Sequence, residues 1–435
     1  MTVVQEQSSS SALEDFNALV KNLHKVIDTI ASQVVATIGT RDPSLVSDKP
    51  SPPASSELLS AFRKFTKLSD EFSSYATSPS EHLTMIAGAF YESTALNVVS
   101  ELGVADLIGK ERVHVSWLAK EANVDQSRLR HVMRMLANRQ VFRETEYGSD
   151  VFENNRMSSI LLSSHEKNLK GFVGHWSDDG YRSADSTLKA FRPENANKSI
   201  FEVHHGMSLW DYFGRPEGAV ARERGNRAMV GAEPILHGGL IYDYDWAKHG
   251  ESATIVDVGA GMGGAAIELT RRFPKLRIIM QDKPEVIESA TEFWKTNAPE
   301  CLPRVAMVPH DFFSPQPSYT SLLPNPPKVY FLRFVLHDWF EDHCVEILKN
   351  IRDVIPKAED GGRLYIAEIL LDKDSDRFKH MVSAHMMNMT GALERTEGEF
   401  AEILRRSGFK IAKVHKNKGF ISLIEAVAVP QVPEL

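Results

Sequence analysis

One histidine and two glutamates in the C-terminal half of the chain have the types and positions that proton transfer requires. His337 follows the apolar run VYFLRFVL, Glu368 lies in the run RLYIAEIL, and Glu394 precedes a helical segment in GALERTEGEF. Histidine accepts a proton near neutral pH, and a carboxylate on one ring nitrogen fixes the tautomer and stabilises the imidazolium. The set suits deprotonation of a hydroxyl that attacks a methyl group, and it requires no metal. The simpler alternative is that Glu368 is a structural strand-end acid and Glu394 caps the following helix.

A glycine-rich turn lies earlier in the same half of the chain. Gly259, Gly261 and Gly264 stand between the apolar run TIVDV and the helical segment AAIELTRRF. Glycines let the backbone approach a ligand closely, and a helix N-terminus suits a carboxylate or a phosphate. Asp282 ends the next apolar run, where it could accept hydrogen bonds from ribose hydroxyls. The same spacing fits a dinucleotide-binding GxGxxG motif, so a nicotinamide cofactor is an alternative at this point.

The end of the third apolar run distinguishes these cofactors. It reads PHDFF, in which Asp311 and Phe312 would offer a hydrogen-bond acceptor and an apolar face to the adenine of S-adenosylmethionine. Dinucleotide folds have no such fixed requirement, so the segment favours S-adenosylmethionine. The plainer interpretation is that Asp282 and Asp311 are merely polar residues at strand ends.

The elements that must position these residues are short apolar runs that alternate with helices from Ala253 onward. The runs are TIVDVGA, RIIMQD, VAMVPHD, VYFLRFVL, RLYIAEIL and ISLIEAVAV. This alternation predicts βαβ units and a mostly parallel sheet that is covered on both faces. We therefore expect an α/β, Rossmann-like domain over residues 235–435, with His337 and Glu368 at one edge of its sheet.

A winged-helix pattern is predicted for Val115–Leu162, which reads as two helices followed by a hairpin with turn residues at Gly148 and Asn154. The second helix carries four arginines: Arg128, Arg130, Arg134 and Arg139. DNA binding is one hypothesis, because a helix of this type can enter the major groove. The alternative is that these arginines form a solvated face on an acidic protein.

The N-terminal region has two further segments. Ala12–Ile38 has apolar residues at helical spacing, which predicts an amphipathic helix that packs on its own chain or across a dimer. Thr40–Ser56 is rich in Pro and Ser and is predicted to be a linker. We divide the chain into residues 1–60, a mainly helical domain with the winged helix over 61–234, and the α/β domain over 235–435.

The composition is that of an ordinary globular protein. The chain has 435 residues, 42% of them hydrophobic, and a formal net charge of -8, so its charge favours neither a nucleic-acid nor an anionic-membrane partner. Its two cysteines, Cys301 and Cys344, lack metal-site spacing, the first residues lack a signal-peptide pattern, and no apolar run approaches the ~20 residues of a membrane span. We predict a soluble protein of a reduced, cytoplasmic compartment.

Six segments resemble the caffeate and flavonoid type of S-adenosylmethionine-dependent O-methyltransferases of plant and fungal secondary metabolism. They are VDVGAGMGG, QDKPEVI, PHDFF, FLRFVLHDW, IAEIL and LERT, and the match covers most of residues 85–427. The resemblance implies His337 as the general base, flanked by the carboxylates of Glu368 and Glu394. It also implies a homodimer that forms through the winged-helix domain.

The resemblance assigns further residues. The implied cofactor contacts are Gly259, Gly261, Asp282, Asp311, Phe312 and Arg333. The implied pocket for a small aromatic or polyketide-type metabolite consists of Met229, Ala232, His385, Met386 and Met389, whose helical spacing by itself fits a core equally well. The family's usual DLP is here Asp282-Lys283-Pro284, a change that removes no required group.

The fold alone does not fix the reaction. Similar proteins of polyketide and pyridone pathways use the cofactor only as structure or fixed charge and catalyse dehydration or pericyclic ring closure. A pericyclase or dehydratase of the same fold is therefore the alternative function. Because His337, Glu368 and Glu394 are all present, the sequence favours methyl transfer.

Overall fold

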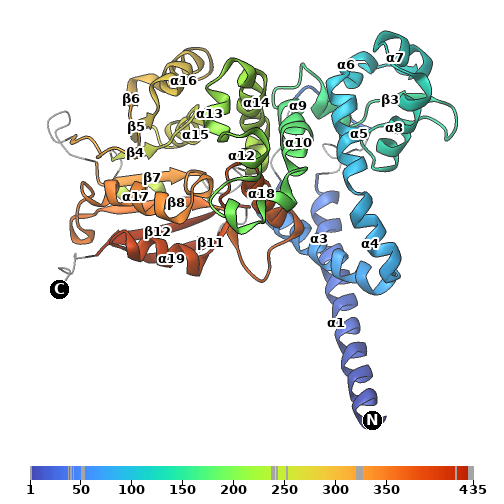
Figure 1. Ribbon diagram of the computed structural model, residues 1–435, viewed down its shortest axis with the longest axis horizontal. Coiled ribbons are helices and arrows are strands. Elements are labelled where there is room, and N and C mark those ends of the chain that lie inside the picture. The colour runs from blue at the N-terminus through green and yellow to red at the C-terminus, as the bar shows by residue number, and fades with distance from the viewer. Residues whose placement is uncertain are drawn as a thin grey trace. The chain divides into compact units, whose positions relative to one another are not determined.

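The computed structural model describes residues 2–37, 39, 42, 44–49, 54–236, 241, 243–250, 253–319, 327–416 and 419–429. The chain forms two compact units (Figure 1). Met1–Asp185 and Met207–Pro234 make up the first unit, and Ser186–Gly206 and Ile235–Leu435 make up the second. The segment Ser186–Gly206, which the sequence analysis places in the helical domain, thus packs with the second unit.

The second unit is built on a seven-stranded sheet with the order β11-β12-β8-β7-β4-β5-β6 (Figure 1). The strands from β8 to β6 in this order are parallel, and β12 is antiparallel to both β8 and β11. The bounds are β4 Thr254–Val258, β5 Arg277–Asp282, β6 Val305–Pro309, β7 Val329–Arg333, β8 Arg363–Glu368, β11 Phe409–Lys416 and β12 Ser422–Ala428. The predicted Rossmann-like α/β fold is confirmed.

Helices cover both faces of this sheet because alternate residues of each strand point to opposite sides. Val256 and Leu332 belong to a core that includes α17 and α19, whereas Ile255 and Phe331 belong to a second core that includes α15 and α16. The helices of the unit include α11 Thr187–Ala190, α12 Ile200–His205, α15 Gly264–Arg272, α16 Pro284–Asn297, α17 Glu341–Arg352, α18 Arg377–Met389 and α19 Glu397–Arg406. The strands are buried almost throughout, as parallel strands with two covered faces should be.

Strand β11 is absent from the predicted set of apolar runs. Its sequence, FKIAKVHK, alternates apolar residues with lysines, and most of its side chains are exposed or half-buried. The strand lies at the edge of the sheet, where exposed lysines discourage pairing with another chain. A search for continuous apolar runs therefore overlooks it.

The first unit contains the predicted winged helix. Strands β1 Arg112–His114, β2 Arg143–Glu144 and β3 Val151–Glu153 form an antiparallel sheet beside helices α7 Val115–Glu121 and α8 Gln126–Asn138. Other elements of the unit are α1 Thr2–Val35, α3 Ser56–Ala76, α4 Pro79–Gly88, α5 Phe90–Glu101, α6 Val104–Ile108, α9 Lys170–Gly174, α10 Tyr181–Ala184, α13 Leu209–Phe213 and α14 Ala219–Leu236. Helix α14 extends past Pro234, where the first unit ends. Among the described residues, no helix has the length and apolar character that crossing a membrane requires.

Of the four arginines that the sequence analysis places on this helix of the winged-helix pattern, three form ion pairs; Arg139 is the C-cap of α8. Arg130 and Arg134 bind Asp150, and Arg134 also binds Glu144, both of which belong to the wing. Arg139 contacts Glu92 of α5 at 3.3 Å, and Arg128 is exposed. Most of the positive charge that the DNA-binding hypothesis needs is thus engaged within the unit.

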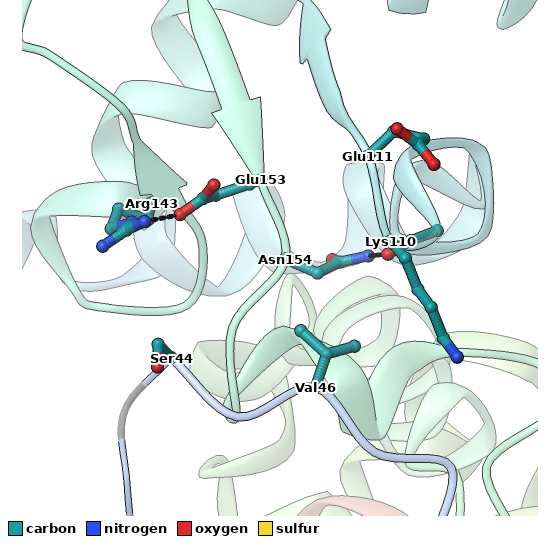
Figure 2. Close-up of a pocket in the computed structure, with 8 residues that line it drawn as sticks. Ser44, Val46, Lys110, Glu111, Arg143, Glu153 and Asn154 are labelled. Atoms are coloured by element: carbon teal, nitrogen blue, oxygen red, sulfur yellow. Dashed lines mark hydrogen bonds and ion pairs between the residues drawn. The ribbon is translucent and has the colours of Figure 1, made fainter.

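The predicted linker is described only in part, because residues 40, 41, 43 and 50–53 and the side chain of Ser56 lie outside the described residues, as does Ile38 at the end of the predicted helix. The backbone oxygen of Asp48 accepts a hydrogen bond from the Glu166 N–H at 2.9 Å. Figure 2 shows Ser44 and Val46 beside a cavity of about 220 Å³ at the base of the wing. Its other lining residues are Gly109, Lys110, Glu111, Arg143, Glu153 and Asn154.

Candidate active site

His337 lies in a tight turn that follows β7. The turn begins at Phe334, a non-glycine residue with a φ of 53°, and continues as a short 3-10 helix over Leu336–Asp338. The Phe334 N–H donates to the Ala367 oxygen of β8, and the Phe334 ring stacks on the imidazole with 5.1 Å between ring centres. The strained backbone of Phe334 turns the chain back over the carboxyl ends of β7 and β8, which brings His337 to the predicted edge of the sheet.

Three carboxylates surround the buried His337 ring. Nδ1 lies 2.8 Å from Glu394 Oε1 and 3.7 Å from Glu368 Oε2, and Nε2 lies 3.8 Å from Asp338 Oδ1. Glu368 and Glu394 are 0% and 4% exposed. Because a carboxylate only accepts hydrogen bonds, Nδ1 carries the proton in this pair and Nε2 is the nitrogen that can accept another.

The two glutamates hold the histidine in different ways. Glu394 contacts the ring directly, whereas Glu368 Oε1 accepts hydrogen bonds from the backbone N–H groups of Val335 and Leu336 at 3.1 and 3.0 Å. Glu394 does not cap α19, because the Thr396 side chain accepts from the Glu399 N–H and Glu399 completes a capping box. The alternative that Glu394 serves only as a cap of this helix is therefore wrong. The alternative that Glu368 is a structural acid at a strand end accounts for its backbone hydrogen bonds but not for its approach to His337.

The charges of this cluster shift the pKa values of its members. Burial disfavours the charged imidazolium, but the surrounding carboxylates of Glu368, Glu394 and Asp338 outweigh it and raise the pKa of His337 to about 10. Burial also raises the pKa of Glu368 to about 7, against the opposing effect of His337. The cluster therefore favours the charged imidazolium at neutral pH, and the neutral ring, in which Nε2 can accept a proton, increases as the pH rises toward about 10.

The glycine turn lies at the same edge of the sheet. Gly259 and Gly261 have φ values of 70° and 56°, which glycine adopts without strain. A Cβ on Gly259 would lie 2.8 Å from the Val335 side chain, while one on Gly261 would project into open space. Asp282 Oδ2 accepts the Gly261 N–H at 2.8 Å, and burial raises the pKa of this carboxyl. The turn thus offers bare backbone beside a carboxylate, which fits the nucleoside and amino-acid ends of S-adenosylmethionine.

The other predicted cofactor residues follow neighbouring strands. Asp311 is exposed and accepts the Phe313 N–H, and Phe312 is half-buried, with its ring 5.8 Å from that of Trp339. Arg333 ends β7, where its guanidinium lies 5.7 Å from the centre of the Phe334 ring. All of these residues lie at the carboxyl ends of β4 to β7, as the sequence predicts.

The residues predicted to line the substrate pocket lie on two helices. Met229, which is exposed, and Ala232, which is buried, belong to α14 in the first unit. His385 and Met389 are buried and Met386 is half-buried on α18 in the second unit. Their role in substrate binding stays a prediction.

Three residues of the second unit were missed by the sequence reasoning: a buried aspartate of β4 and two residues that contact the histidine turn. Asp257 in β4 is 3% exposed, and burial raises its pKa to about 7 although the charge of Arg333 acts in the opposite direction. Arg395 and Cys344 donate hydrogen bonds to the backbone of the histidine turn. Arg395 directly follows Glu394, and this adjacency is the one signal that could have identified it.

Comparisons with known proteins agree with this geometry. An O-methyltransferase domain matches residues 186–410, more than half of the chain, and an O-methyltransferase dimerisation domain matches residues 84–164. The chain is 30% identical to the O-methyltransferase tpcA of Aspergillus fumigatus, with 86% of this chain and 88% of tpcA covered. It is 26% identical to 4-O-methyltransferase 1 of Phanerochaete chrysosporium, with 85% and 89% covered.

Solved structures of the same kind match as well. The crystal structure of LaPhzM superposes with a TM-score of 0.70 at 27% identity, with 81% of this chain and all of that chain covered. The mitomycin 7-O-methyltransferase MmcR gives a TM-score of 0.69 at 26% identity, with 80% and 98% covered. These relatives give no support to the pericyclase alternative. The chain belongs to the S-adenosylmethionine-dependent O-methyltransferases of secondary metabolism.

Proposed function

We propose that this enzyme methylates a hydroxyl of a small aromatic or polyketide-type secondary metabolite, with His337 as the general base. The observation that carries the proposal is the 2.8 Å contact between His337 Nδ1 and Glu394, which makes Nε2 the nitrogen that receives a proton when the ring is in its neutral form. Glu368 supports the same role by holding the turn and by adding a second negative charge 3.7 Å from Nδ1.

The proton transfer follows from the charges of the cluster. A phenolic hydroxyl has an ordinary pKa of about 10 in water, close to the pKa of about 10 to which the carboxylates raise His337. Transfer of the phenolic proton to Nε2 is then nearly balanced in free energy, and it leaves a phenolate beside an imidazolium. S-adenosylmethionine supplies, when bound, a methyl group on a positively charged sulfur. His337 holds the proton while the phenolate attacks the methyl group. After the transfer the oxygen belongs to a neutral ether, which does not take the proton back.

Residues of the second unit would hold this cofactor. Gly259 and Gly261 give access to backbone N–H groups, and Asp282 retains acceptor capacity for ribose hydroxyls after its contacts with Gly261 and Lys283. Asp311 and Phe312 would contact the adenine, and Arg333 would neutralise nearby acidic charge.

The substrate class rests on the pocket residues and on the relatives. His385, Met386 and Met389 of α18 would provide an apolar, adaptable lining for a ring system. Similar proteins include a phenazine O-methyltransferase of Lysobacter antibioticus and a mitomycin biosynthesis 6-O-methyltransferase of Streptomyces lavendulae, both named for ring-bearing compounds. The two cysteines, both free and buried, support the proposal of a reduced, cytoplasmic setting.

Mass spectrometry tests the reaction. The purified protein is incubated with S-adenosylmethionine and a panel of phenols, hydroquinones, naphthols and polyketide extracts, and both S-adenosylhomocysteine and substrate mass are followed. We expect a gain of one CH₂ in the substrate and an equal amount of S-adenosylhomocysteine. A dehydrated or isomerised product without S-adenosylhomocysteine would contradict methyl transfer.

The assembly proposed for the enzyme is a homodimer formed through α4 and the start of α5. Helix α4 has no buried residue, although it carries three large apolar side chains: Leu83, Met85 and Ile86. Phe90 and Tyr91 at the start of α5 are also exposed. This surface overlaps the match to the dimerisation domain over residues 84–164, which supports a second copy of the chain as its occupant.

A further inference from the structure

The backbone turn that carries His337 is held on two sides. On one side its N–H groups at Val335 and Leu336 donate to Glu368. On the other side two of its carbonyls, those of Leu336 and Trp339, point to the side chain of Arg395. These two carbonyls bracket His337 and Asp338, so a contact that fixes them restricts the backbone from which the imidazole projects.

Arg395 spans both carbonyls with one guanidinium. Nη1 donates to the Leu336 oxygen at 2.7 Å, and Nη2 donates to the Trp339 oxygen at 2.5 Å. The side chain is 5% exposed, and the hydrogen bonds of Arg395 go to this turn and not to a carboxylate within the part of the chain that the structure describes. A planar guanidinium can reach two acceptors at fixed separation, whereas a lysine ammonium has no such fork.

Arg395 is itself held in place. It belongs to β10 Arg395–Thr396, which pairs in parallel with β9 Leu370–Leu371, and its guanidinium lies 5.9 Å from the centre of the Phe400 ring. Because β9 directly follows the strand that ends at Glu368, this short pairing links the segment that carries Glu394 to the one that carries Glu368. Arg395 therefore connects the acidic partners of His337 to the turn that presents it.

We propose that Arg395 is a positioning residue, which holds the Leu336–Trp339 turn so that His337 Nδ1 faces Glu394 and Nε2 faces the substrate. The role rests on the proposed function of His337 as the general base. Cys344 assists, because its thiol lies 3.3 Å from each of the same two carbonyl oxygens. A thiol is a weak donor, so Arg395 provides the larger share.

The test compares Arg395→Lys, which keeps the charge but loses the fork, with Arg405→Lys on the exposed surface of α19, where Arg405 pairs with Glu402. Proton NMR with ¹⁵N-labelled histidine detects the Nδ1 proton shared by His337 and Glu394, and His337→Gln assigns this resonance. We expect Arg395→Lys to move or broaden the resonance and Arg405→Lys to leave it unchanged. An unchanged resonance in Arg395→Lys would overturn the proposal.

Turnover and cofactor binding complete the test. A displacement of about 1 Å can lower turnover by about 100-fold, so we expect such a fall in kcat for Arg395→Lys with S-adenosylhomocysteine affinity within about twofold of the parent. A fall in kcat with an unmoved resonance also counts against positioning. The resonance reports the placement of His337 even when no tested hydroxyl is methylated, which separates this inference from the proposed function.

A second variant covers the case in which Arg395→Lys does not fold, as judged by circular dichroism. Cys344→Ala removes the weaker donor from the same two carbonyls and leaves Arg395 in place. We expect a smaller movement of the resonance, restored in Cys344→Ser, which again has a donor. These two Cys344 variants then provide the test. An unmoved resonance in Cys344→Ala would overturn the proposal that donors to the Leu336 and Trp339 carbonyls position His337.

Discussion

The turn that carries His337 and the helix α4 differ in how fully their own unit satisfies them: the polar groups of the turn are hydrogen-bonded, whereas the apolar side chains of α4 are exposed. The turn receives hydrogen bonds to its carbonyls from Arg395 and gives its N–H groups to Glu368, all within the second unit. Helix α4 in the first unit exposes Leu83 by 66% and Ile86 by 62%, with no residue buried. The difference teaches that the buried histidine cluster is held entirely by residues of its own unit, whereas the apolar side chains of α4 are left uncovered by theirs.

The largest effect should follow from removing the histidine. We expect His337→Gln to lower turnover by about 100-fold or more, the usual scale for a lost general base, because no other imidazole contacts both glutamates within the described residues. Calorimetry should find S-adenosylhomocysteine affinity within about twofold of the parent. His131→Gln, which changes an exposed histidine of α8, is the matched control. Parental turnover in His337→Gln would refute the role of His337 as the general base, and the histidine turn would then have no catalytic part to set against α4.

The next effect concerns α4. Leu83→Glu combined with Ile86→Glu should weaken the dimer by about 100-fold or more in Kd, since each buried leucine or isoleucine contributes about 1.5–3 kcal/mol. Light scattering across a dilution series measures this change, and Thr84→Glu on the same helix is the control. If the double variant remains dimeric at the same concentrations as the parent, α4 is not the interface.

The smallest effect is a displaced pH profile. Below a pH of about 10 the carboxylates keep His337 protonated, so turnover by a general base should rise as pH rises toward that value. Glu394→Gln removes a negative charge 2.8 Å from Nδ1, which lowers the pKa of His337 and should move the rise to lower pH by about 1 to 3 units. A profile that stays in place, or moves to higher pH, would show that Glu394 does not set the charge of the ring.

The sequence predicts the sheet and its edge well because both follow from strong local patterns. Runs such as TIVDV and VYFLR are buried on both faces, and the residues that follow them meet at one edge by the geometry of parallel strands. His337, Glu368 and Glu394 could be assembled from this logic together with the family resemblance. Strand β11 could not, because its lysines break the apolar run.

The roles of Arg395 and Phe334 illustrate what remains beyond such reasoning. Arg395 contacts main-chain oxygens, which every residue type possesses, so no spacing of side chains reveals its partners. The φ of 53° at Phe334 arises from the path of the chain between β7 and β8, and phenylalanine carries no local preference for it. The sequence likewise does not show that Glu394 contacts the imidazole ring while Glu368 accepts hydrogen bonds from the backbone, because these roles depend on distances in the folded chain.

The thiol of Cys344 also determines how this protein should respond to alkylating reagents. Burial raises the pKa of Cys344 to about 12, so the nucleophilic thiolate is scarce at neutral pH, and the thiol is enclosed between two carbonyls of the histidine turn. Cys301 is fully buried too. Iodoacetamide should therefore leave the native enzyme unlabelled, and the appearance of labelled chains in a mass spectrum would measure how often the second unit opens.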